Sequence, residues 1–65
     1  MQINSSAISS ADYKENTKEL TVVFRQSGKT YTYSSVPQDV WDQFQSAASQ
    51  GSYFNANIKN NYSFV

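Results

Sequence analysis

A chain of 65 residues is long enough for one small domain with a thin core, so its five Tyr, four Phe and one Trp must supply most of the buried surface. Five cations balance five anions, and any binding of the isolated chain to nucleic acid is therefore expected to be weak. The absence of His and Cys excludes disulfide bonds, zinc sites built on these ligands, and the most common catalytic bases and nucleophiles.

The first part of the chain predicts one short strand between two polar stretches. Residues 1–7 are mostly polar, and we expect them to be loose. Residues 8–13 are expected to form a strand that ends at the strong strand former Tyr13, although apolar and polar side chains alternate poorly along it. The charged stretch 14–18 is typical of a connecting turn.

The clearest pattern in the sequence predicts a hairpin. Apolar side chains alternate over residues 20–24 and again over 30–34, which is the period of two of half-buried strands. A two-residue turn at Ser27 and Gly28 would join them. This register predicts two apolar cross-strand pairs, Phe24 with Tyr31 and Val22 with Tyr33.

From Gln38 the pattern changes to that of an amphipathic helix, which covers the apolar face of the hairpin. Val40 and Phe44 lie on its apolar stripe, and Trp41 flanks that stripe. Either Gln38 or the preceding proline is the first helical residue. We expect Gly51 to form the left-handed cap at the end of this helix.

A second, shorter helix is expected after Ser52, its predicted cap. Phe54, Ile58 and Tyr62 recur there every four residues. Asn residues are frequent in this stretch and form helices only modestly well, so irregular coil is the alternative. Residues 63–65 are expected to be a tail.

These elements predict an α+β fold for a single domain over residues 8–62. Its sheet is a three-stranded antiparallel meander covered on one face by an α-helix, with a short C-terminal helical segment. The predicted core consists of the apolar residues on the facing sides of these elements: Leu20, Val22, Phe24, Tyr31, Tyr33, Val40, Phe44, Phe54, Ile58 and Tyr62.

Several short motifs occur here in a familiar order. Tyr31-Thr32-Tyr33, Val36-Pro37 and Tyr53-Phe54-Asn55, within a stretch from Ser9 to Tyr62, resemble the KTSC domain. That family is named for the C-terminus of some lysyl-tRNA synthetases and also occurs as stand-alone bacterial proteins. The resemblance implies the fold predicted above. It also suggests RNA as a partner through the association with a synthetase, while no activity of the family is established.

Catalysis has no convincing candidate residues. Asp39 and Asp42 lie three residues apart, but on the side of the predicted helix that faces solvent. Gly28 has no phosphate-binding loop around it, and the five acids show no spacing typical of a metal site. We therefore expect a non-catalytic binding or accessory domain without cofactor or metal.

Two classes of partner are considered. The first is weakly bound RNA, for which the candidate contacts are Arg25, Lys29, Tyr53 and Lys59. Stacking of bases on Tyr31 and Tyr33 is the less favoured alternative, because the predicted register turns both rings toward the helix. The second class is a protein, bound through a sheet edge or through an apolar surface patch of Val23 with Trp41, Tyr53 or Phe64.

The sequence also suggests where the chain is found. The first 20 residues lack the basic start and apolar run of a secretory signal, and no stretch approaches the roughly 18 apolar residues of a membrane span. We expect a soluble cytoplasmic protein with no membrane partner.

Overall fold

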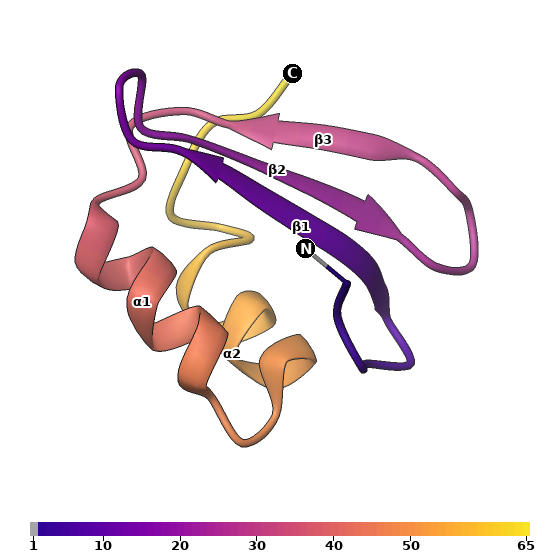
Figure 1. The fold of residues 1–65 in the computed structure, drawn as a ribbon. Coiled ribbons are helices and arrows are strands. Elements are labelled where there is room, and N and C mark those ends of the chain that lie inside the picture. The colour runs from indigo at the N-terminus through magenta and orange to yellow at the C-terminus, as the bar shows by residue number, and fades with distance from the viewer. Residues whose placement is uncertain (1) are drawn as a thin grey trace.

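Three antiparallel strands are followed by two helices that lie on the same face of the sheet (Figure 1). The computed structural model describes residues 2–65. Its elements are β1 (Ile8–Lys14), β2 (Glu19–Phe24), β3 (Thr30–Tyr33), α1 (Gln38–Ser46) and α2 (Gln50–Asn57). The strand order β1-β2-β3 is a meander, which confirms the predicted α+β fold class.

Strand β1 contains an irregularity that explains its poor alternation. Ala11 lies opposite Val22, but Ile8 lies opposite Phe24, because the register shifts between Ile8 and Ser10. An extra residue at this point, a β-bulge, reverses the alternation of faces. Ile8 and Ala11, three residues apart, are therefore both buried under the helices.

The β2–β3 turn is longer than predicted. Val22 lies opposite Tyr31, so the predicted register is wrong by two residues. The Phe24 N–H donates to the Lys29 carbonyl oxygen at 2.9 Å, and the Gly28 N–H donates to the Phe24 carbonyl oxygen at 2.8 Å. Gly28 adopts a φ of 69°, so it ends a four-residue loop in the left-handed region. A shift of two residues keeps every side chain on its predicted face.

The first helix ends, and the second begins, earlier in the sequence than predicted. Helix α1 follows Pro37 and ends at Ser46, and Gly51 lies within the first turn of α2 instead of capping α1. The cap of α2 is Ser49, whose side-chain oxygen accepts a hydrogen bond from the Ser52 N–H at 3.4 Å. A serine cap at this position satisfies a free N–H of the first turn, so the new helix begins three residues before the predicted start.

Helix α2 also ends earlier than predicted. The predicted second helix is confirmed over Gln50–Asn57, but Tyr62 lies beyond its end. The Asn57 side chain donates to the Tyr53 carbonyl oxygen at 3.2 Å, and the Asn61 side chain donates to the Asn57 carbonyl oxygen at 2.7 Å. Asparagine side chains thus bond the backbone where the helix ends, as they commonly do outside helix interiors.

Residues 2–7, here called the amino-terminal arm, contribute to the core. Ile3 is only 1% exposed, and its N–H donates to the Ser9 carbonyl oxygen at 3.0 Å. A β-carbon added at Gly51 would lie 2.9 Å from the Ser5 Oγ, so the arm also approaches the first turn of α2 closely. The expected loose segment therefore includes a buried side chain that the sequence pattern does not reveal.

The core lies between the sheet and the helices. Its buried residues come from the arm, the strands, the β3–α1 connection and the helices: Ile3, Ile8, Ala11, Leu20, Val22, Tyr33, Val36, Trp41, Phe44, Phe54 and Ile58. Four residues assigned to the core from the sequence are only partly buried and pack against it: Phe24, Tyr31, Val40 and Tyr62.

Trp41 is buried, whereas the proposed apolar patch requires it at the surface. It is 9% exposed, and its ring stacks on Tyr13 with a centroid distance of 5.6 Å. Val23 points to the opposite face of the sheet, because its neighbour Val22 faces the core. The proposed apolar patch that combines Val23 with Trp41 is therefore wrong.

Candidate binding groove

A groove of about 520 Å³ lies at the end of the sheet where β2 turns into β3. The arm forms one side of it, the β2–β3 turn another, and Lys59, two residues after the end of α2, a third. Its lining combines apolar, hydroxyl, amide and ammonium groups: Ser6, Ala7, Phe24, Gln26, Ser27, Tyr31 and Lys59.

Two partly buried aromatic rings form the apolar part of the groove. Phe24 and Tyr31 pack edge to face, with a centroid distance of 5.3 Å and an interplanar angle of 67°. Phe24 also contacts the buried Phe54, with a centroid distance of 5.5 Å, and Tyr31 contacts Phe64 at 4.8 Å. Because each ring also packs against another aromatic ring, the two form a preformed aromatic wall of the groove.

Lys59 supplies the charge. Its backbone N–H donates to the Phe54 carbonyl oxygen at 2.9 Å, so the backbone that carries this lysine is fixed at the end of α2. The side chain is exposed, and it is the one charged side chain in the described lining. The groove thus presents a cation beside two aromatic rings.

Arg25, a candidate RNA contact, has a different role. Its Nε donates to the Ser5 carbonyl oxygen at 2.9 Å, and its Nη2 donates to the carbonyl oxygens of Ile3 at 3.1 Å and Ile8 at 3.3 Å. The guanidinium therefore holds the arm against the sheet. Its positive charge lies at the same end of the sheet as the groove, but its Nε and Nη2 donors are occupied.

Lys29 and Tyr53 lie outside the groove lining. Lys29 follows the β2–β3 turn, where its N–H donates to the Ser27 Oγ at 3.2 Å, and its side chain is exposed. Tyr53 faces α1, where its hydroxyl donates to the Gln43 Oε1 at 3.4 Å and its ring contacts Phe44. Of the four candidates, Lys59 alone lines the groove, with Arg25 and Lys29 at the same end of the sheet.

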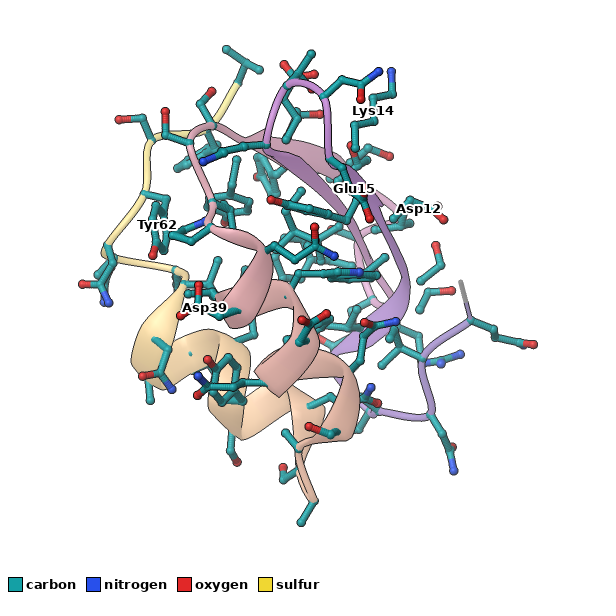
Figure 2. The ribbon with its side chains drawn as sticks, turned by 60° about the vertical axis from the view of Figure 1, so that its left-hand side comes forward. Asp12, Lys14, Glu15, Asp39 and Tyr62 are labelled. Atoms are coloured by element: carbon teal, nitrogen blue, oxygen red, sulfur yellow. The ribbon has the colours of Figure 1, made fainter. Side chains whose placement is uncertain are left out.

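The opposite end of the sheet carries most of the acidic side chains, together with Lys14 and Lys18. Figure 2 shows Lys14 and Glu15 at the β1–β2 turn, above the helix that carries Asp39. The Gln38 side chain donates to the Glu15 Oε1 at 3.2 Å and joins the turn to the start of α1. Burial raises the pKa of Tyr13, and the negative charges of Glu15, Asp39 and Asp42 raise it further.

The balanced net charge therefore conceals a separation of charge. Lys59 lines the groove, Arg25 and Lys29 lie at the same end of the sheet, and the lining formed by the described residues has no acidic side chain. Asp39 and Asp42 lie on α1, and the remaining acids lie on β1, in the β1–β2 turn or at the start of β2. An anionic ligand is attracted to the groove end of the molecule.

Other kinds of site find no support in the described residues. Across residues 2–65, no three acidic side chains converge on a common point where a metal ion would bind. Neither helix in that range is long and apolar enough to span a membrane.

Comparisons with known proteins agree on one family. A model of the KTSC domain matches residues 4–62. The chain is similar to a lysine–tRNA ligase of Nostoc punctiforme, with 37% identity over 59 residues that cover 91% of this chain and 10% of the ligase. It thus spans about a tenth of the length of that relative. The crystal structure of a KTSC domain protein from Yersinia pestis has a TM-score of 0.95 and 34% identity, covering 100% of this chain and 90% of the other.

Proposed function

Because the chain belongs to the KTSC domain family, we propose that it is a non-catalytic accessory domain that binds single-stranded RNA weakly through the groove. The observation that carries this proposal is the juxtaposition of Tyr31, Phe24 and Lys59 in one groove. The similarity to part of a tRNA ligase makes RNA the favoured polyanion.

Each part of the groove suits one part of a nucleotide. Exposed atoms of Tyr31 and Phe24 offer a surface on which an unpaired base packs, and such contacts contribute about 1–3 kcal/mol per base. The Gln26 amide and the Ser6 and Ser27 hydroxyls offer hydrogen bonds to a base edge or ribose. The Lys59 ammonium is placed to pair with a phosphate.

The small number of cations limits the affinity. Each phosphate contact on a single strand contributes roughly 0.7 to the slope of log K against log salt concentration, so one lysine contact gives a shallow salt dependence. Weak binding is sufficient for a domain tethered to a larger RNA-binding protein, because tethering raises the effective concentration. The similarity to a small part of a much longer ligase fits this arrangement.

A titration of the ¹⁵N-labelled chain with a single-stranded ten-nucleotide RNA at low salt tests the proposal. Shifts of the Ser6, Gln26, Ser27 and Lys59 amides are expected. Lys59→Gln should weaken binding severalfold, whereas Lys14→Gln, at the opposite end of the sheet, should leave it unchanged. Absence of shifts at millimolar RNA, or equal losses in both variants, would contradict the proposal.

A further inference from the structure

We infer that the RNA strand continues from the groove into a second, neighbouring cavity, and that Arg25 binds the phosphate of the nucleotide held there. The inference rests on the proposed function, because the first nucleotide occupies the groove. It extends that function by giving the ligand a minimum length of two nucleotides and a second phosphate contact.

The second cavity is a polar hollow of about 630 Å³ between the arm and Arg25, the residue that follows β2. Apart from Arg25, its described lining comes entirely from the arm: Gln2, Ile3, Asn4, Ser5 and Ser6. Ser6 lines the groove as well. The two cavities are therefore adjacent, and a strand that leaves the groove over Ser6 enters the second cavity.

Each cavity has one cation in its lining. Lys59 lines the groove and Arg25 lines the second cavity, and the described residues around both include no acidic side chain. A nucleic-acid strand carries one negative charge per nucleotide. One cation in each of two adjacent cavities therefore matches two successive nucleotides of one strand.

Arg25 has donor groups left for a phosphate. Its Nε and Nη2 donate to backbone carbonyl oxygens of the arm and of Ile8, but none of these three bonds uses Nη1. A guanidinium has five N–H donors in one plane, and Nη1 carries two of them. Because the three carbonyl bonds fix this plane, the cation loses little conformational freedom when Nη1 binds a phosphate oxygen.

The second nucleotide is held differently from the first. The described lining of the second cavity has no aromatic ring, so the base there does not stack as it does on Tyr31. The side-chain amides of Gln2 and Asn4 offer hydrogen bonds to a base edge or ribose. The gain in affinity from the second nucleotide therefore depends mainly on its phosphate and on the charge of this cavity.

The test compares uridine 5′-monophosphate with the 5′-phosphorylated dinucleotide of uridine, each titrated into the ¹⁵N-labelled chain at low salt. Both should shift the groove amides of Gln26 and Lys59, and only the dinucleotide should also shift those of Asn4 and Ser5. The dinucleotide should bind about tenfold more tightly, the lower end of what a hydrogen bond to a charged group contributes. A dinucleotide with a neutral methylphosphonate linkage should bind no more tightly than the mononucleotide.

A charge placed in the second cavity provides the matched protein variant. Asn4 is exposed, and Asn4→Asp adds a carboxylate of nearly the same shape that competes for the Arg25 donors. This variant should lose the gain from the second nucleotide and keep mononucleotide binding within about twofold of the parent's, because salt screens a charge outside the groove. Asn16→Asp makes the same change in the β1–β2 turn, at the opposite end of the sheet, and should bind both probes as the parent does.

The outcomes separate this inference from the proposed function. If the mononucleotide shifts the groove amides and the dinucleotide binds no more tightly, the inference is overturned and the proposed function stands. Retention of the gain by the methylphosphonate dinucleotide, or by Asn4→Asp, also overturns the inference. If the dinucleotide gives no shifts at millimolar concentration, the inference fails, and the titration with the ten-nucleotide RNA then decides whether the proposed function stands.

Discussion

The guanidinium of Arg25 donates a hydrogen bond to the backbone carbonyl oxygen of Ile3 at 3.1 Å. Two more bonds, to the carbonyl oxygens of Ser5 and Ile8, complete a bridge from the β2–β3 turn to the arm and to the first residue of β1. The planar guanidinium presents several donors in fixed directions, which a lysine does not. A residue that the sequence suggests for RNA binding thus holds the arm in place and keeps Ile3 buried.

Arg25→Lys is therefore expected to lower the free energy of unfolding by about 1–2 kcal/mol, because three hydrogen bonds from one partly exposed cation are lost. Urea denaturation followed by circular dichroism measures the loss. Lys29→Gln, which removes a neighbouring exposed cation, should change stability by less than about 0.5 kcal/mol. Equal stability of Arg25→Lys and the parent would show that the bridge is unimportant.

The fold could be predicted because alternation of side chains determines which face of a strand is buried. Leu20, Val22 and Tyr33 face the core even though the register of the hairpin differs from the predicted one. The register itself depends on where the left-handed residue lies in the turn. Gly28 marks a turn but does not reveal whether it stands at the centre of a short loop or at the end of a longer one.

The groove was harder to predict, because it depends on segments without a periodic pattern. Ser6 and Ala7 belong to an arm whose position is set by Arg25 and by the burial of Ile3. Tyr31 was assigned to the core, yet it is partly buried and lines the groove. A period of two identifies the face on which a ring lies, but not whether the helices extend far enough to cover it.

Gly28→Ala is expected to destabilise the domain by about 1–2 kcal/mol through the backbone alone. The residue has a φ of 69°, and an added β-carbon would meet no atom within 4 Å, so no clash contributes. Gly28→Asn should cost less, because Asn tolerates the left-handed region. Thermal denaturation of the two variants compares them directly, and equal losses would point to a cause other than φ.

Ser49→Ala tests which serine caps α2. Removal of the hydroxyl that accepts from the Ser52 N–H should cost about 0.5–1 kcal/mol, while Ser49→Asp should retain the cap. Ser52→Ala leaves the capping oxygen in place and should cost less than Ser49→Ala. The reverse order in urea denaturation would favour Ser52, the cap expected from the sequence.

Tyr13 should make the stability depend on pH in the alkaline range. Its hydroxyl donates to the Val36 carbonyl oxygen, and burial, followed by nearby acids such as Glu15, raises its pKa above the ordinary value of 10.0. The folded state therefore retains this proton more strongly than the unfolded state does. The stabilisation is complete below pH 10 and is lost as the pH rises through the raised pKa.

Tyr13→Phe is consequently expected to cost about 1 kcal/mol at pH 7, the net contribution of one hydrogen bond. The stability difference between parent and variant should then shrink as the pH rises above about 10, because the parent alone loses the contribution of this hydroxyl. Burial also raises the pKa of Tyr33, and burial followed by the nearby Tyr62 raises that of Tyr53. Both proteins keep these two groups, so their alkaline destabilisation cancels in the difference. Urea denaturation of both proteins between pH 7 and pH 11 measures this difference in the free energy of unfolding. A difference that stays constant over this range would show that Tyr13 does not control the alkaline response.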